Sequence, residues 1–295
     1  MNITILGGAG FIGSSLSKLL LDEKHNVTVI DTFQWGFDSI LSLISYNNFN
    51  CIKQDIRDPN LNFKDTDLIV LLAAVVGYPS CDRHPDLAWD VNVNGTQNVV
   101  NKANGKKIVF ASTGSVYGEL NQTCTEEVLP NPITLYSETK LKGEEIISQI
   151  NGVNLRPATA FGVSNRLRTD LLVNDFVKII LKEKQLTLFE GHFKRTFLSA
   201  FDLARGFKFA IDNYDILKGK AWNLGDESLN YTKLEIAEII KTIIDYKLET
   251  SNLRHDQDGR NYFVDYSKIK NLGFTATETI EESIYKLIKV YKCMM

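Results

Sequence analysis

Hydrophobic residues in the first half of the chain form short runs that alternate with longer amphipathic stretches. The runs predict strands and the stretches 11–21 and 86–103 predict helices between them; the strands are Asn2–Leu6, Val27–Ile30, Asp67–Leu72, Lys107–Ser112 and Gly152–Leu155. Several runs are apolar throughout, as expected when helices cover both faces of a sheet. The pattern predicts an α/β fold with a doubly wound parallel sheet.

The second half of the chain has a looser pattern. It predicts helices over 171–181, 202–212 and 278–291 and a strand over 220–224. Thr232 and Glu235 have the spacing of a capping box, which predicts a helix start near Tyr231. We therefore expect a first domain over 1–160, to which some later segments return, and a smaller C-terminal α/β lobe over 161–295.

Composition excludes several classes of function. The 295 residues are 44% hydrophobic and have a formal net charge of −3, so there is no basic excess that would indicate binding to nucleic acid or to a membrane surface. The longest apolar run, 68–77, has about half of the roughly 20 residues that a membrane helix requires. With no secretory signal at its start, the chain is expected to be cytoplasmic. The cysteines and histidines lack metal-ligand spacing, so we expect no metal.

A glycine-rich turn follows the first predicted strand and opens a predicted helix. Its glycines are Gly7, Gly10 and Gly13, with Phe11 and Ile12 at the helix start. Glycines at this spacing permit a tight turn and let the backbone approach a pyrophosphate, which the N–H groups of the helix N-terminus can bind. The turn predicts a dinucleotide site in a Rossmann-type domain.

Three further positions refine the dinucleotide prediction. Asp31 ends the second strand, where its carboxylate can accept hydrogen bonds from the adenosine ribose. This carboxylate would repel a 2′-phosphate, and no Arg or Lys follows it before Lys53, so NAD is favoured over NADP. The pair Asp55-Ile56 is either an adenine contact or an ordinary turn. Likewise, Ala73-Ala74 either leave room for the cofactor or are small because of close packing.

Tyr136 and Lys140 stand four residues apart, which places a phenol and an ammonium on one helix face. A phenol has a pKa near 10, so it acts as a base at neutral pH only beside a cation. The spacing alone is weak evidence, because it also occurs at Tyr214, Tyr266 and Tyr285. Position distinguishes Tyr136: it lies just downstream of the fifth strand and its loop, where Thr113 can hydrogen-bond a substrate hydroxyl.

With these motifs the chain resembles the extended short-chain dehydrogenases/reductases, specifically the NAD-dependent nucleotide-sugar epimerases and dehydratases. Further landmarks of that family occur in its order: Leu71-Leu72-Ala73-Ala74, Asn92-x-x-Gly95-Thr96, Leu155-Arg156-Pro157 through Phe161-Gly162, and Arg195 followed by Asp202-Leu203-Ala204. The resemblance covers nearly the whole chain.

The resemblance implies roles for these residues. Tyr136 would deprotonate a sugar hydroxyl, usually on C4, while hydride passes to NAD, and Lys140 would also hold the nicotinamide ribose. Arg195 would contact the nucleotide diphosphate, as a guanidinium fork suits phosphate oxygens. Arg260 is either a second phosphate ligand or a solvated loop charge. The remaining implied contacts are Pro157 with the cofactor and Thr113, Ser115, Tyr136 and Thr159 with the substrate.

Departures from the family pattern narrow the reaction. Gly114 and Ser115 stand where 4,6-dehydratases have the Asp and Glu that eliminate water, so dehydration lacks its acid and base. The leading hypothesis is a 4-epimerase, and the alternative is a 4-dehydrogenase that releases a 4-keto sugar. Asp31 disfavours a keto-sugar reductase, and the intact Thr113, Tyr136 and Lys140 argue against a non-catalytic NAD-binding protein. The resemblance also implies a role in polysaccharide precursor synthesis and a homodimer, or higher homo-oligomer, formed through helix 86–103 and the helix of Tyr136.

Overall fold

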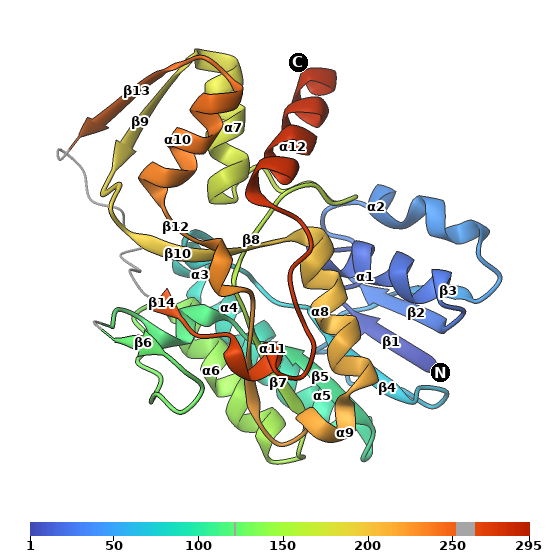
Figure 1. Cartoon of the computed structure of the whole chain (residues 1–295). Helices are drawn as coiled ribbons and strands as arrows, with labels where there is room; N and C mark the ends of the chain where they lie inside the picture. The colour runs from blue at the N-terminus through green and yellow to red at the C-terminus, as the bar shows by residue number, and fades with distance from the viewer. Residues whose placement is uncertain (121, 252–262) are drawn as a thin grey trace.

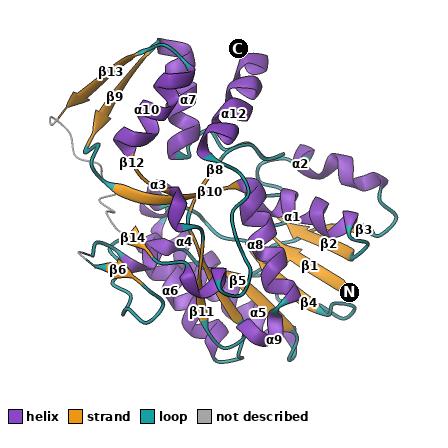
Figure 2. Cartoon of the chain, viewed as in Figure 1, coloured by secondary structure: helices purple, strands orange, loops and turns teal. Residues whose placement is uncertain are grey.

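A computed structural model describes residues 1–120, 122–251 and 263–295 and is built on a seven-stranded parallel sheet (Figures 1 and 2). The strand order is β11-β7-β5-β4-β1-β2-β3. The strands are β1 (Asn2–Leu6), β2 (Asn26–Asp31), β3 (Phe49–Lys53), β4 (Leu68–Leu71), β5 (Lys107–Ala111), β7 (Val153–Pro157) and β11 (Ala221–Leu224). The predicted Rossmann-type fold is confirmed.

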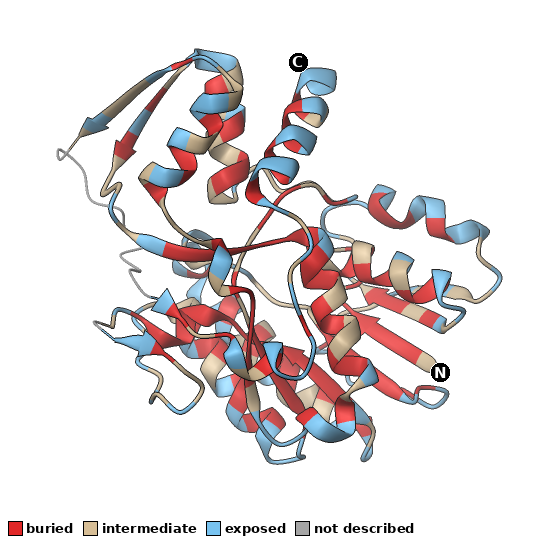
Figure 3. Cartoon of the chain, viewed as in Figure 1, coloured by how far each residue is buried: buried red, intermediate tan, exposed pale blue. Residues whose placement is uncertain are grey.

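Helices cover both faces of this sheet. On one face α1 (Phe11–Asp22) packs against α8 (Ala200–Asp212), and on the other α5 (Gly95–Ala103) packs against α6 (Leu135–Ser148). Apolar side chains of the strands are buried beneath both pairs, which explains why β4 is buried along its whole length (Figure 3). The shorter helices are α2 (Asp38–Leu41), α3 (Tyr78–Arg83), α4 (Pro85–Trp89), α9 (Tyr214–Leu217) and α11 (Ser267–Lys270).

The strand order reverses at β1, which pairs with β2 on one side and with β4 on the other. Ligands of open α/β sheets bind at the carboxyl ends of the strands at such a reversal. Here the residues that follow these ends are Gly7 after β1 and Ala73 after β4. The fold therefore places the glycine-rich turn at the expected ligand-binding edge.

A second hydrophobic core lies beyond this edge. It is formed by α7 (Leu172–Glu183), α10 (Lys233–Ile243) and α12 (Ile280–Met294), together with strands of two small sheets (Figure 1). One sheet contains β12 (Asn230–Thr232), β10 (Lys194–Ser199) and β8 (Thr159–Phe161), and the other contains β13 (Lys247–Ser251) and β9 (Gln185–Phe189). A further pair joins β14 (Phe263–Val264) to β6 (Thr123–Cys124).

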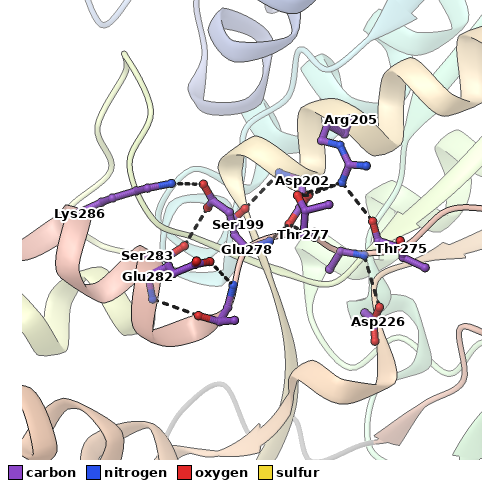
Figure 4. A network of polar contacts seen from close by, with 12 residues as sticks. Ser199, Asp202, Arg205, Asp226, Thr275, Thr277, Glu278, Glu282, Ser283 and Lys286 are labelled. Carbon is purple, nitrogen blue, oxygen red and sulfur yellow. Dashed lines mark hydrogen bonds and ion pairs between the residues drawn. The ribbon is translucent and has the colours of Figure 1, made fainter.

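A buried carboxylate attaches the segment before α12 to α8. Asp202 accepts hydrogen bonds from the backbone N–H groups of Thr277 and Glu278, both at 2.9 Å, and pairs with Arg205 at 2.6 Å (Figure 4). The Thr277 hydroxyl donates to the same carboxylate at 2.8 Å. These bonds, which we call the α8–α12 junction, attach the chain segment that precedes the C-terminal helix to the sheet domain.

The observed elements differ from the predicted ones in a few places. The single helix predicted over 86–103 consists of α4, a π-helical segment at Asp90–Asn94, and α5. The predicted Thr232–Glu235 capping box is confirmed and begins α10. A second box, Thr279 with Glu282, begins α12 two residues later than predicted. Across the described residues, no helix has the length and hydropathy needed to cross a membrane.

Candidate active site

The glycine-rich turn requires glycine at two positions because an added Cβ would collide with the protein's own backbone. Gly7 has a φ of +81°, and a Cβ there would lie 2.7 Å from the Ala73 backbone nitrogen. A Cβ on Gly13 would lie 2.5 Å from the Gly7 carbonyl oxygen. Gly10 is the N-cap of α1 and has no side chain to bond the first N–H groups of the helix. These groups, in the turn that includes Phe11 and Ile12, are suited to bind a pyrophosphate.

Asp31 lies beside this turn. Its carboxylate accepts hydrogen bonds from the backbone N–H of Ala9 at 3.0 Å and of Phe33 at 2.9 Å. The carboxylate is thus fixed at the end of β2, where an adenosine ribose would meet it.

A positive charge reaches this region from far along the chain. Arg166 stacks on the Trp35 ring at 4.6 Å from guanidinium carbon to ring centre. Burial lowers the pKa of Arg166, as does Arg168, whereas the carboxylates of Asp170 and Asp31 act against this. The fold therefore brings close to Asp31 a cation that the local sequence, with no Arg or Lys between Asp31 and Lys53, did not indicate.

Asp55 and Ile56, the predicted adenine contacts, follow β3. The Asp55 carboxylate pairs with Arg57 at 2.7 Å, and hydrogen bonds from Arg57 lower the pKa of Asp55. Arg57 also pairs with Asp90 at 2.7 Å. Ile56 is buried against Gly95, where a Cβ would lie 2.7 Å from the Ile56 side chain. Both residues thus have structural partners within the protein.

Tyr136 and Lys140 lie one turn apart on α6. The helix begins at a capping box in which the Thr134 hydroxyl accepts from the Ser137 N–H, and the Ser137 hydroxyl is bonded to the Thr134 N–H in return. The cap fixes the first turn, and with it Tyr136, against the preceding chain. Tyr136 is half-buried, whereas Lys140 is only 2% exposed.

The Lys140 ammonium occupies an apolar environment. It lies 4.4 Å from the centre of the Phe110 ring. Burial lowers its pKa from 10.5 to about 7, and the opposing effects of Cys81 and Glu144 are smaller. Perturbed lysines of this kind are typical of functional sites.

Thr113 follows β5 and begins the short 3₁₀ turn Gly114–Tyr117, which contacts α6. Its hydroxyl oxygen accepts from the Ser115 N–H at 3.1 Å and donates to the Ser115 hydroxyl at 3.0 Å. Both side chains are buried at the carboxyl end of the sheet. The turn thus brings two of the predicted substrate contacts together, beside the helix that carries Tyr136.

Asn92 connects α6 to the edge of the sheet where the glycine-rich turn lies. Its amide donates to the Val75 carbonyl and to the Thr139 hydroxyl, both at 3.0 Å, and accepts from the Val75 N–H at 2.8 Å. Val75 directly follows Ala73-Ala74, and Thr139 lies between the two catalytic candidates. Asn92 was predictable only as a landmark of the family, because the π-helical turn that contains it is not visible in the hydrophobic pattern.

The other predicted substrate and cofactor contacts lie farther along the chain. Pro157 ends β7 next to Leu224 of β11. Thr159 and Arg195 lie on the neighbouring strands β8 and β10, Thr159 half-buried and Arg195 buried. Arg260 lies outside the described residues. Elsewhere in the chain, the described residues contain no group of three or more His, Cys, Asp or Glu placed to hold a metal ion.

Comparison with known proteins identifies relatives over the whole chain. A family model described as "NAD dependent epimerase/dehydratase family" matches residues 3–225. The chain is 29% identical to a putative UDP-glucose 4-epimerase of Methanocaldococcus jannaschii, over 98% of each sequence. It is 30% identical to UDP-glucuronic acid decarboxylase 1 of Xenopus tropicalis, over 98% of this chain and 72% of that protein.

Solved structures agree with the sequence matches. The structure of UDP-glucuronic acid 4-epimerase from Bacillus cereus, in complex with UDP-glucuronic acid and NAD, superimposes with a TM-score of 0.89. Its sequence is 26% identical, and the match covers 100% of both chains.

Proposed function

The chain belongs to the NAD-dependent epimerase/dehydratase family, and on that premise we propose that this NAD-dependent nucleotide-sugar enzyme is a 4-epimerase. One observation carries the proposal. Tyr136 and Lys140 share a face of α6 beside the Thr113 turn, at the same sheet edge as the glycine-rich turn. A base, a cation and a hydroxyl donor thus stand where a dinucleotide and a second ligand would meet.

The chain's own residues account for the proton transfers. Tyr136 removes the proton of the C4 hydroxyl, and the Lys140 charge stabilises the phenolate. Thr113 orients the same hydroxyl by a hydrogen bond. Bound NAD supplies the hydride acceptor and donor. After the sugar ring rotates, Tyr136 returns its proton to the C4 oxygen of the inverted product.

Substrate recognition is proposed to involve the second lobe. Arg195 would bind the diphosphate, with Arg260 as a second ligand, and Ser115 and Thr159 would contact the sugar. Residues 1–160 would form the NAD-binding domain, completed by α8 and β11, and 161–295 the nucleotide-sugar lobe. The relatives act on UDP-glucose or UDP-glucuronic acid by name, so UDP-sugars are the first to test.

Two other outcomes use the same oxidation at C4. A 4-dehydrogenase would release the 4-keto sugar, and its reduced cofactor would be reoxidised by a second substrate. A decarboxylase, as the Xenopus relative is named, would require a uronic acid substrate. The 4-epimerase is favoured because it needs neither a second substrate nor a catalytic group beyond those at the site.

We also propose that the protein is a homodimer that buries α4, α5 and α6. Two large apolar side chains on this helical surface, Leu87 and Trp89 of α4, are exposed. Light scattering should then give twice the 33.3 kDa chain mass. A Trp89→Glu variant should shift the protein to the monomer.

Mass spectrometry of the purified protein with UDP-, GDP-, dTDP- and CDP-sugars, without added cofactor, tests the proposed reaction. The proposal predicts an isomeric product of unchanged mass with NAD retained on the protein. A product lighter by two hydrogens, with NADH building up, would indicate the dehydrogenase. Loss of carbon dioxide would indicate a decarboxylase.

A further inference from the structure

One buried carboxylate joins the catalytic helix to two strands of the sheet. Glu144 lies one turn beyond Lys140 on α6, and its side chain is buried. Its Oε2 accepts from Arg156 Nη2 at 2.7 Å and its Oε1 accepts from Arg156 Nε at 2.9 Å. The Ser112 hydroxyl donates to the same Oε1.

The two donors belong to residues that adjoin the site. Ser112 directly precedes Thr113 at the end of β5, and Arg156 directly precedes Pro157 at the end of β7. One carboxylate therefore fixes α6, with Tyr136 and Lys140, relative to both strand ends.

The far end of the Thr113 turn is attached to the cluster formed by Glu144, Ser112 and Arg156. Arg156 Nη1 donates to the Tyr117 hydroxyl at 3.0 Å, and that hydroxyl donates to Asn223 Oδ1 of β11 at 2.8 Å. Tyr117 ends the 3₁₀ turn that Thr113 begins. The turn is thus held at both ends, by Ser112 and by Tyr117.

Stability alone is a poor explanation for this cluster. Burying a carboxylate and a guanidinium carries a desolvation penalty, and apolar side chains of similar volume often stabilise a core as well or better. A charged group whose hydrogen bonds are all made instead fixes the relative positions of the elements that it joins. Proton and hydride transfer are sensitive to these positions, since displacing a reacting group by about 1 Å can lower a rate on the order of 100-fold.

We propose that Glu144 is a positioning residue for oxidation at C4, acting through Ser112 on Thr113 and through its own helix on Tyr136 and Lys140. This inference rests on the proposed function. It assigns Glu144 no contact with substrate or cofactor, so loss of the cluster should lower the rate of chemistry while leaving ligand affinity unchanged.

A pair of serine variants tests the proposal. Ser112→Ala removes the hydroxyl that bonds Glu144 but leaves the Glu144–Arg156 pair intact. Ser283→Ala is the matched control, because Ser283 is also buried and donates to a glutamate, Glu278, at 2.9 Å, but on α12. Glu144→Gln, which keeps the shape and removes the charge, is the stronger variant if it folds.

Four quantities are measured for each protein: bound NAD after denaturation, the melting temperature, KM, and the rate at which NADH absorbance appears in a single turnover. We expect Ser112→Ala to slow NADH formation about 10- to 100-fold with KM and bound NAD within about twofold of wild type. Ser283→Ala should lower the melting temperature by about as much as Ser112→Ala does, but it should keep the wild-type rate of NADH formation.

The proposal is wrong if Ser112→Ala and Ser283→Ala have equal rates, or if the rate falls only in proportion to bound NAD or folded protein. NADH formation is common to all reactions that begin by oxidation at C4, so this comparison holds for an epimerase and for a dehydrogenase. Failure of the proposed function itself would show differently, as wild-type protein that reduces no bound NAD with any nucleotide sugar.

Discussion

Lys140 on α6, one turn from Tyr136, and Asp202 at the α8–α12 junction are both buried charges, but their surroundings differ. Asp202 is 0% exposed, and its carboxylate accepts two backbone N–H groups, a hydroxyl and a guanidinium. Lys140 has an aromatic ring against its ammonium, and the carboxylate one turn away, Glu144, is bound to Arg156 and Ser112.

The difference fits a structural role for Asp202 and the proposed role of Lys140 as the cation beside Tyr136. The carboxylate at the α8–α12 junction has all its hydrogen-bond partners, so it joins α8 to the segment before α12 at little cost in free energy. A poorly compensated lysine destabilises the fold, and it is retained where a reaction needs a cation beside a phenol. Removing the two charges should therefore have opposite effects on stability.

The largest expected effect is a gain of stability in Lys140→Met. One pKa unit corresponds to about 1.4 kcal/mol, so lowering the pKa from 10.5 to about 7 costs the folded state on the order of 5 kcal/mol. Because the folded pKa lies below the unfolded one, this cost is fully present below pH 7 and disappears as the pH rises toward 10.5. Denaturant unfolding of the cofactor-free protein at pH 6, 8 and 9.5 should show the variant's advantage shrinking in that order.

Lys142→Met is the control for this prediction. Lys142 is exposed on the same helix and pairs with Glu145 at 2.8 Å, so its loss should leave the stability nearly unchanged at every pH. If the wild type and Lys140→Met showed the same pH dependence, Lys140 would not be the poorly compensated charge described above.

Tyr136→Phe removes the proposed base without changing either buried charge. We expect turnover to fall about 1000-fold, within the range typical of general acid–base groups, with NAD still bound. Tyr285→Phe is a matched control, since Tyr285 and Lys289 have the same spacing on α12 and Tyr285 is exposed. Turnover by Tyr136→Phe at the rate of Tyr285→Phe would remove Tyr136 from the mechanism.

Asp202→Asn breaks the α8–α12 junction and should cost about 3 kcal/mol, because Arg205 and two backbone N–H groups lose a charged partner. Asp212→Asn, at an exposed pair of Asp212 with Lys208, should cost less than about 1 kcal/mol. Equilibrium unfolding measures both. A loss no larger in Asp202→Asn than in Asp212→Asn would mean that the carboxylate is not what attaches the segment before α12 to α8.

Gly7→Ala should destabilise the protein by about 2 kcal/mol, less than Asp202→Asn does, and should abolish NAD binding. Gly105→Ala separates the two contributions, because Gly105 has nearly the same φ, +79°, with no atom within 4 Å of an added Cβ. The excess cost of Gly7→Ala over Gly105→Ala then reports the collision with Ala73. Equal free-energy costs in the two variants would mean that the close approach of Ala73 does not contribute to the effect of Gly7→Ala.

Features that depend on neighbouring residues were predictable from the sequence. Asn2–Leu6 is a strand with the predicted bounds, and Thr232 caps its helix through Glu235 as expected. The glycine-rich turn could be found because each glycine meets a need of its own backbone, such as the positive φ of Gly7. The fold class followed from the alternation of apolar runs.

Features that depend on the packing of distant segments were not predictable. Glu144 is bonded by Ser112 and Arg156, which lie 32 and 12 residues away, and no pattern indicated their meeting. Glu144 did leave one signal, an acidic residue four positions after Lys140 on a buried helix face. Arg166 likewise reaches the surroundings of Asp31 only through the fold.

In the proposed 4-epimerase, C4 is oxidised and then reduced by the same hydride. The most direct test is conversion of a nucleotide sugar carrying deuterium at C4, followed by mass spectrometry and NMR of the product. A 4-epimerase should give an epimer with inverted C4 that keeps its deuterium, because the hydride returns to the carbon it left. An inverted product that has lost deuterium to solvent would contradict this mechanism.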